Sequence, residues 1–255
     1  MDAATAGART PLRAYLLEAR YEFLRLLRTP SFSLPTLLFP ALFYLLFGVL
    51  LGSHRGGHVA ARYFLATYGV FGVMGVALFG FGASVALDRE GGLLALKRAL
   101  PMPPAAYLLA KTAMAMIFAT AVSVLLAAIA AGLAGVSLSP WQWMALLATN
   151  VLGVLPFAAI GLWLGGIVGA QGAPAVINLI YLPMAFLSGL WVPLGMLPPT
   201  LASLAQLWPA YHLAAIALRI VGQDTGQPWG PHLAVLAIVT VAFGLLAWRR
   251  LARPA

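Results

Sequence analysis

The sequence predicts an all-α polytopic membrane protein, and three observations lead to this class. Of the 255 residues, 62% are hydrophobic and only 8% are charged, whereas soluble domains carry about 25% charged residues. Six apolar stretches, each close to the length that crosses a bilayer, run from residue 31 to residue 248. Almost every charged residue lies between these stretches. We therefore expect a single transmembrane domain over residues 1–255 with six membrane-spanning helices.

The basic residues are distributed unevenly between the spans, and this distribution predicts an orientation. If both termini face the cytoplasm, twelve of the 15 Lys and Arg residues lie on the cytoplasmic side, and only Arg55, Arg62 and Arg219 lie outside. Basic residues favour the cytoplasmic side of a membrane. We expect a multi-pass protein of the cell (inner) membrane with both termini cytoplasmic. Anionic lipid headgroups then account for the net charge of +9, and nucleic acid is not an expected partner.

Residues 10–29 are expected to form an amphipathic helix, which Pro30 ends. Its apolar residues recur at helical spacing, and most of its charged residues lie off this stripe. Two interpretations remain open: a helix in the headgroup layer with its arginines toward phosphate, and an ordinary basic segment beside the membrane. The apolar stripe consists of Leu12, Tyr15, Ala19, Phe23 and Leu26.

The six expected spans are residues 31–52, 62–87, 107–134, 141–169, 173–191 and 231–248. The fourth span carries Gly161, Gly165 and Gly169, a spacing of small residues that favours tight helix packing, either within one subunit or between two. The fourth span begins with Trp141 and the sixth ends with Trp248. Tryptophan is typical of the membrane interface, so these residues support the boundaries of both spans.

Segment 192–212 is too apolar for a water-exposed loop and contains too many prolines for a complete crossing. Pro193, Pro198 and Pro209 interrupt it. Irregular backbone is tolerated at membrane depth only where protein or a cavity surrounds it. We therefore expect a re-entrant hairpin that dips in from the outer face between the fifth and sixth spans.

The sequence has no pattern that is typical of an enzyme. It contains no P-loop, no Gly-x-Ser-x-Gly, no cluster with metal-ligand spacing and no cysteine. We expect no catalytic residue, no metal and no cofactor bound by this chain. None of the six carboxylates lies deep inside a predicted span, so we also expect no buried titratable group that could couple transport to an ion gradient.

The loop 88–105, between the second and third spans, carries the densest charge. Acidic residues stand at its start and basic residues follow a run of leucines, an order that suits the dipole of a short helix between Gly92 and Pro101. Two neighbouring helices need only about 2–8 residues to connect them. The extra length and the apolar residues indicate either a surface for a protein partner or a solvated hairpin on the membrane.

Two stretches of the sequence resemble motifs of type-2 ABC exporter permeases. One is Arg89-Glu90-Gly91-Gly92-Leu93-Leu94, followed by Arg98-Ala99-Leu100-Pro101 and by Tyr107-Leu108-Leu109-Ala110-Lys111. It is similar to the Arg-Glu-x-Gly-Thr-Leu, Arg-rich turn, Pro and Leu-Leu-x-Lys of that family. The other is Phe186-Leu187-Ser188-Gly189 with Pro193, Pro209 and Tyr211, similar to Phe-Leu-Ser-Gly-x-x-x-Pro and Pro-x-Tyr. Leu93 and Pro104 depart from the family pattern, which has Thr and commonly a basic residue there.

The resemblance implies a permease subunit that works as a dimer, with two copies of a separate ABC ATPase that bind ATP and Mg²⁺. We expect a homodimer, and a pair with a related chain stays open. The resemblance also implies that the loop after the second span is a coupling helix. In that reading Asp88, Arg89 and Glu90 hold the loop against the membrane helices and the N-terminal helix. Gly92 begins the helix, and Leu94, Lys97 and Arg98 face the ATPase. The implied outer gate contains Ser188, Gly189, Pro193, Pro198, Pro209 and Tyr211.

The expected substrate path runs between two copies along the second and fifth spans. Candidate lining residues are Phe71, Phe79, Asn150, Asn178, Tyr181 and Phe186. Because no buried charge is expected, the passenger is predicted to be a lipophilic or amphipathic molecule such as a drug, a lipid or a lipid-linked glycan. A polysaccharide stays open, since aromatic side chains can stack on sugars. Two other classes also stay open: an ion-coupled carrier or channel, and a membrane-embedded enzyme or scaffold.

Overall fold

The computed structural model describes residues 10–52, 57–99, 104–223 and 226–251. Within these ranges every regular element is a helix and none is a strand, which confirms the expected all-α class. The elements are, in chain order, α1 (Thr10–Leu27), α2 (Pro30–Phe43), η1 (Tyr44–Leu50), α4 (His58–Ala77), η2 (Leu78–Ala83), α5 (Ser84–Glu90), α6 (Leu93–Ala99), α7 (Pro104–Gly132), α8 (Pro140–Leu152), α9 (Val154–Ile167), α10 (Ala173–Leu187), η3 (Leu194–Met196), α11 (Pro199–Leu204), η4 (Ala205–Leu207), α12 (Pro209–Ile220) and α13 (Trp229–Leu251).

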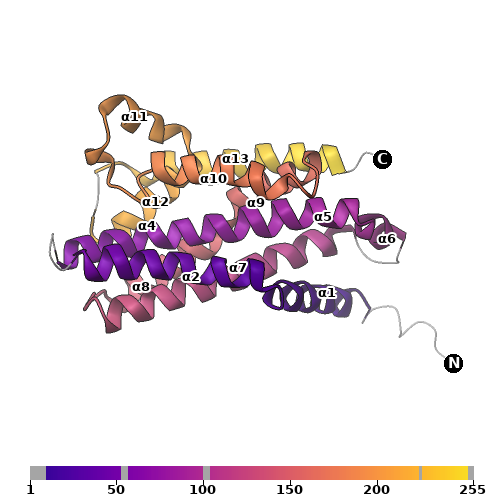
Figure 1. Cartoon of the computed structure of the whole chain (residues 1–255), viewed down its shortest axis with the longest axis horizontal. Coiled ribbons are helices and arrows are strands. Elements are labelled where there is room, and N and C mark those ends of the chain that lie inside the picture. Colours follow the sequence, from indigo (N-terminus) through magenta and orange to yellow (C-terminus); the bar gives the residue numbers. More distant parts are fainter. Residues whose placement is uncertain (1–9, 53–56, 100–103, 224–225, 252–255) are drawn as a thin grey trace.

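The long helices form an elongated bundle whose axis is horizontal in Figure 1. α1, α6 and the C-terminal end of α13 lie at one end of the bundle, which we call the α6 end. α11 protrudes at the opposite end, which we call the α11 end (Figure 1). This arrangement separates two regions that the sequence analysis singled out, the charged loop and the proline-rich segment.

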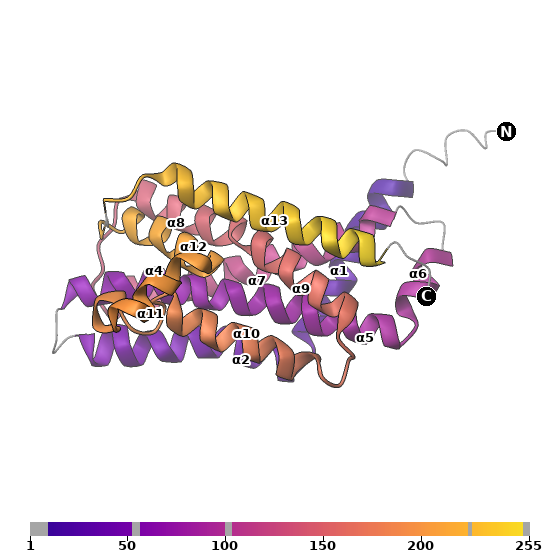
Figure 2. The same ribbon diagram turned by 90° about the horizontal axis from the view of Figure 1, so that it is seen from above.

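The continuous helix formed by α4, η2 and α5 is the centre of the bundle. In its most apolar window 78% of the residues are buried, whereas the corresponding share for α13 is 11%. α13 accordingly runs along the edge of the bundle (Figure 2). α9 approaches the central helix closely, because a Cβ atom on Gly165 would lie 2.7 Å from the carbonyl oxygen of Gly82. The fourth-span glycines are therefore used for packing within one chain.

Among the described residues, five helices are long and apolar enough to cross a membrane: Pro30–Leu50, His58–Glu90, Tyr107–Gly132, Pro140–Ile167 and Trp229–Arg250. The expected fifth span differs, because α10 has 15 residues. At 1.5 Å per residue it is shorter than the hydrocarbon core of about 30 Å. It ends where Gly189 adopts a φ of +79°, a conformation that stops helices. Beyond it, Pro199–Leu207 and Pro209–Ile220 meet at 95°, and this bent pair raises the number of spans to six if it is taken as one.

Helix α1 packs on α7, a contact that neither interpretation from the sequence included. Leu26 is buried, and the ring of Phe23 lies 5.5 Å from that of Phe118. The C-terminal part of the apolar stripe, Phe23 and Leu26, is therefore packed against protein. The opposite side of α1 leaves Leu17 and Tyr21 exposed, so that side remains available to the membrane interface.

Candidate functional site

Four charged side chains from α1, α5 and α7 form a buried network at the α6 end, which we call the charge cluster. It consists of Glu22, Arg25, Asp88 and Lys111. The Lys111 ammonium is completely buried and pairs with the Glu22 carboxylate and, at 3.2 Å, with Asp88 Oδ2. Arg25 Nη2 lies 2.7 Å from Asp88 Oδ1. Two anions thus balance two cations, so the network is neutral as a whole.

Hydrogen bonds complete the charge cluster and extend it into the centre of the bundle. The Tyr107 hydroxyl donates to Asp88 Oδ2 at 2.7 Å, so this carboxylate has three partners. Lys111 Nζ also donates to Ser84 Oγ at 2.8 Å, and Ser84 Oγ donates in turn to the Gly80 carbonyl in η2. Buried charges are tolerated when they are paired and hydrogen-bonded in this way. A displacement of α1 or α5 would be transmitted to η2 through these ion pairs and hydrogen bonds.

The Arg25 guanidinium stays charged in this environment. Burial by itself would lower its pKa, but the hydrogen bond to Asp88 and the negative charges of Asp88 and Glu22 outweigh burial and raise the pKa of Arg25. Its charge therefore does not vary with pH in the working range of a protein. Arg25 acts as a fixed cation that holds α1 to the end of α5.

The charge cluster was not identified from the sequence. We expected no buried titratable group that could couple transport to an ion gradient, and the structure shows buried titratable groups: Glu22 and Asp88 are each only 3% exposed and Lys111 is fully buried. The sequence carried a signal that points to this network. Lys111 lies inside the predicted third span, and a charge at that place requires a partner. Glu22 was assigned to the polar side of the N-terminal helix, so its partner was missed.

α6 is held to the same network by a second ion pair. Lys97 Nζ pairs with Glu18 of α1, and it lies 4.6 Å from the centroid of the Tyr107 ring. Leu94 packs against the buried core. Both side chains were expected to face a partner, but they face the chain's own helices. The outward side of α6 instead presents Leu96, which is 59% exposed. The side chain of Arg98 lies outside the described residues.

The turn between α5 and α6 fixes the direction in which α6 leaves the bundle. Gly92 has a φ of +75°, a conformation that favours glycine by about 1–2 kcal/mol. Next to it, Arg89 Nη2 donates to the Val168 carbonyl at 2.9 Å, which ties the end of α5 to the end of α9. Glu90 is 50% exposed, and Arg89 Nη2 lies 3.9 Å from it. Asp88 and Arg89 thus hold the loop, while Glu90 remains open to solvent.

At the α11 end, the segment expected to form a gate is attached to α4 and to the aromatic core. The Tyr63 hydroxyl donates to the Gly189 carbonyl at 2.6 Å. Trp191 stacks on Phe43, with 6.0 Å between ring centroids. Ser188 is buried, and its hydroxyl has no hydrogen-bond partner among the described residues. Prolines start three of the four described helices of the segment: Pro193 precedes η3, Pro198 and Pro199 stand at the start of α11, and Pro209 begins α12.

A histidine pair fastens this segment to α13, and the sequence analysis missed it. His212 Nδ1 lies 2.9 Å from His232 Nδ1, and His212 Nε2 lies 2.9 Å from the Gln206 carbonyl. Because a carbonyl only accepts, His212 Nε2 carries the hydrogen, and in the neutral pair His232 Nδ1 must donate to His212 Nδ1. The Tyr211 ring packs edge-on against both rings. Among the described residues no group of three or more potential metal ligands is present.

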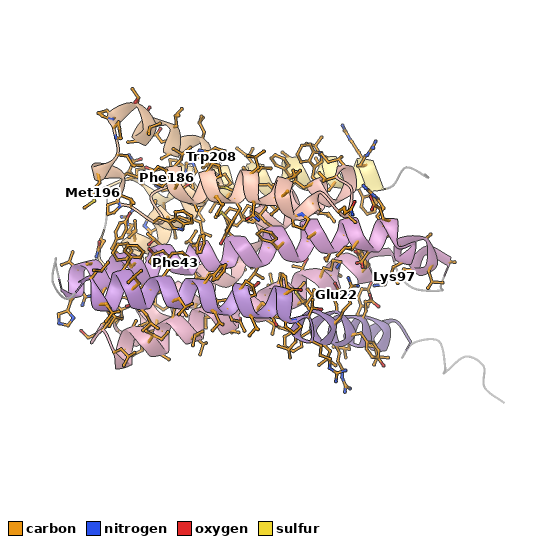
Figure 3. All side chains as sticks on the ribbon, viewed as in Figure 1. Glu22, Phe43, Lys97, Phe186, Met196 and Trp208 are labelled. Carbon is orange, nitrogen blue, oxygen red and sulfur yellow. The ribbon has the colours of Figure 1, made fainter. Side chains whose placement is uncertain are left out.

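The six candidates for the substrate path fall in three different places. Phe71 and Tyr181 are buried and stacked at 4.9 Å, and Phe79 meets Tyr181 edge-on at 5.7 Å. Asn178 and Phe186 lie exposed on α10. Asn150 of α8 contacts a different face of the central helix from Tyr181. The Asn150 amide packs against Gly69, whereas the Tyr181 ring packs against Gly75. Figure 3 shows Phe186 at the α11 end, and Glu22 and Lys97 at the α6 end.

Comparison with known proteins is consistent with this arrangement. Residues 14–221 match the family model described as ABC-2 type transporter. The chain is also 28% identical, over 228 residues, to the Bacillus subtilis (strain 168) protein named "Putative transport permease YvfS". That alignment covers 89% of this chain and 92% of the relative. The residues matched by the family model include the charge cluster and α6.

Proposed function

The chain belongs to the ABC-2 type transporter family, and from this premise we propose that it is the membrane subunit of an ATP-driven exporter. The family and the apolar spans establish a multi-pass transporter subunit rather than an enzyme. Our proposal adds the energy source, which is ATP and Mg²⁺ bound by two copies of a separate ABC ATPase. It also adds a homodimer of this chain, in the cell (inner) membrane, with the α6 end in the cytoplasm.

The observation that carries the proposal is the attachment of α6 to the charge cluster. Through Lys97 and Glu18, α6 is tied to α1, and through Asp88 and Lys111 the same network reaches α7 and η2. A push on the exposed side of α6 would move several helices together rather than bend a free loop. Such an element suits the transmission of motion from an ATPase to the spans.

The substrate path in this proposal runs between two copies past α4 and α10. Leu179, Leu182 and Phe186 leave an exposed apolar face on α10, which we assign to the neighbouring copy and the path. Every described carboxylate lies at the α6 end, so the α11 half offers aromatic and aliphatic side chains and few charges. A lipophilic or amphipathic passenger, such as a drug, a lipid or a lipid-linked glycan, fits this lining, and a polysaccharide that stacks on aromatic rings is the alternative.

Substitution of Leu96 tests the proposed contact with the ATPase. Leu96→Glu places a charge on the exposed side of α6 without touching the buried contacts of Leu94 and Lys97. We expect the variant to fold and to lose co-purification with its ATPase and substrate-stimulated ATP hydrolysis. Leu207→Glu, at a leucine that is 74% exposed at the α11 end, is the matched control and should retain both. Equal behaviour of the two variants would refute the role of α6.

The buried charge cluster is the one observation that favours an ion-coupled carrier. Its place argues against that role, because Asp88 stands two residues from the end of α5 and Lys111 about two turns from the start of α7. Sites that couple ions to transport lie near the bilayer midplane. The carrier alternative predicts transport in vesicles that contain this chain and an ion gradient but no ATPase.

A further inference from the structure

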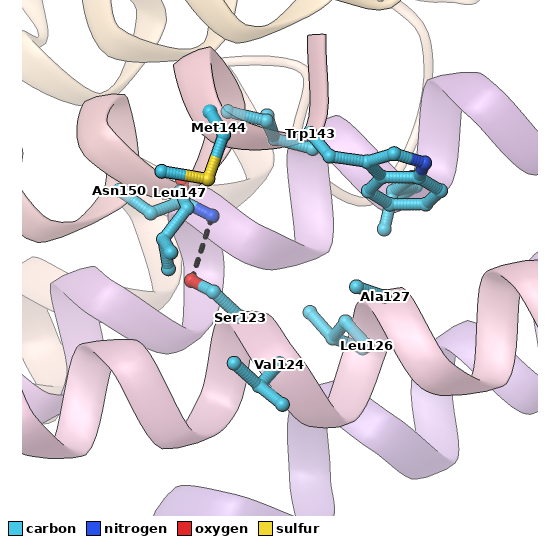
Figure 4. A pocket seen from close by; sticks show the side chains of 10 residues that line it. Ser123, Val124, Leu126, Ala127, Trp143, Met144, Leu147 and Asn150 are labelled. Atoms are coloured by element: carbon cyan, nitrogen blue, oxygen red, sulfur yellow. Dashed lines mark hydrogen bonds between the residues drawn. The ribbon is translucent and has the colours of Figure 1, made fainter. Parts of the chain in front are cut away.

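A cavity of about 200 Å³ lies between α4, α7 and α8, away from the charge cluster and from the Phe71–Tyr181 stack. Leu65 closes it on the α4 side. From α7 and α8 it is lined by Val124, Ala127, Trp143, Met144 and Leu147 among others (Figure 4). The substrate path that we propose runs along a different face of α4, so this cavity is not part of it.

The cavity opens toward the surroundings of the bundle and lies between three of the candidate membrane spans. Val124 and Met144 on its rim are 54% and 62% exposed. Trp143 is three residues from the start of α8, and Asn150 is seven residues further along, about 10 Å deeper at 1.5 Å per residue. A ligand would therefore enter from the hydrocarbon region near one membrane interface and not from water.

The deep end of the cavity is polar, although its walls are apolar. Asn150 Nδ2 donates to Ser123 Oγ at 3.0 Å, as Figure 4 shows. Ser123 Oγ donates to no acceptor among the described residues, so its hydrogen is available to a ligand. Asn150 is only 2% exposed, and its Oδ1 has no hydrogen-bond partner among the described residues. A buried amide oxygen without a partner is costly, but this oxygen is not accessible from the cavity and packs against Gly69 of α4.

We propose that this cavity is a binding site for a small, neutral molecule that carries one hydroxyl group on an apolar ring or short chain. No charged residue is among the described side chains that line it, so an ion has no partner there. An apolar cavity of about 150 Å³ accommodates benzene, so about 200 Å³ suits one substituted ring. The Ser123 hydroxyl can donate its hydrogen to the oxygen of such a group, or accept from it through its second lone pair. This inference is independent of the exporter proposal.

Quenching of Trp143 fluorescence by 4-bromophenol tests the site. The full chain in lipid nanodiscs is titrated with this probe, and Trp143→Phe identifies the part of the signal that comes from Trp143. We expect saturable quenching. Ala127→Leu fills the cavity and should weaken the apparent affinity at least about tenfold, whereas Ser123→Ala, which keeps the volume, should weaken it about fivefold. Bromobenzene, which lacks the hydroxyl, should also bind about fivefold or more weakly.

The matched control is Ala131→Leu, the same change one turn away on an exposed position of α7. It should leave the affinity for 4-bromophenol unchanged. Quenching that does not saturate, or that is equal in Ala127→Leu and Ala131→Leu, reports only dissolution of the probe in the bilayer and would overturn the proposal. Equal affinities for 4-bromophenol and bromobenzene would overturn the assignment of a hydroxyl-bearing ligand.

Discussion

At the scale of single residues, Lys111 decides how the α6 end is organised. A lysine inside a membrane span is retained only with a partner, and Lys111 has both Glu22 and Asp88. The sequence could predict that Lys111 needs an anion, because it lies inside an apolar stretch. It could not predict which one, because Glu22 is 89 residues away in the chain and its place depends on how α1 packs on α7.

We predict that Lys111→Met lowers the free energy of unfolding by about 3–5 kcal/mol, since it leaves two buried carboxylates with only Arg25. The measurement is thermal or denaturant unfolding in detergent micelles. Adding Glu22→Gln should recover part of the loss, with a coupling of about 0.5–3 kcal/mol. Lys97→Met is the matched control and should cost nearer to about 1 kcal/mol, as for more exposed pairs. A Lys111→Met protein as stable as the parent would contradict the buried network.

His232→Phe tests the histidine pair at the α11 end. The substitution keeps a ring but removes the donor for His212 Nδ1, and an unsatisfied buried acceptor costs about 1–3 kcal/mol. We expect faster proteolysis of the 192–228 segment and a lower midpoint of thermal unfolding. His58→Phe, at an exposed histidine, should change neither. If the two variants behave alike, the pair does not fasten α12 to α13.

At the scale of elements, the lengths of the apolar stretches predicted most of the helices. They predicted less well where these helices are interrupted. The glycine spacing in the fourth span indicated a close approach, and α9 makes it against η2. The π-helical turns η1 and η2 have no signal in composition or periodicity, because one extra residue in a turn depends on tertiary contacts. α10 is short because Gly189 ends it. The Phe-Leu-Ser-Gly motif contains this glycine, but it indicated the left-handed backbone of Gly189 only indirectly.

Gly165→Ala should destabilise the protein, because the new Cβ would lie 2.7 Å from the Gly82 carbonyl oxygen and 2.9 Å from Val85. Overpacking of this kind costs about 1–3 kcal/mol. Gly244→Ala in α13 is the control, since nothing lies within 4 Å of its added Cβ, and a helical alanine there should stabilise by up to about 1 kcal/mol. Unfolding of both variants in micelles gives the comparison, and a neutral Gly165→Ala would contradict the tight packing of α9 on η2.

At the scale of the whole molecule, the distribution of basic residues between the two ends of the bundle predicts how the chain is oriented in the membrane. The Lys and Arg residues of α6 and of the end of α13 lie at the α6 end, and Arg62 and Arg219 lie on the α4 and α12 helices toward the other end (Figure 1). This division was predictable because most charged residues avoid the hydrocarbon region, although Lys111 lies inside a span. Which copies and partners assemble around the chain was indicated only by family resemblance, since no residue pattern within one chain encodes it.

The absence of cysteine from the sequence makes the orientation directly testable. We predict that Gln227→Cys reacts with a membrane-impermeant maleimide in intact cells and that Arg250→Cys reacts only after permeabilisation. Both positions are exposed and lie outside or at the edge of a span. Labelling of Arg250→Cys in intact cells would reverse the proposed topology and place α6 away from any cytoplasmic ATPase.

The most direct measurement is transport by proteoliposomes that contain the purified chain with or without its ATPase. We predict accumulation of a lipophilic or amphipathic substrate only when the ATPase and Mg-ATP are both present. The Leu96→Glu protein should show no accumulation under the same conditions. Uphill transport by the chain alone, driven by a proton or sodium gradient, would contradict the proposal that α6 receives the energy for transport from a separate ATPase.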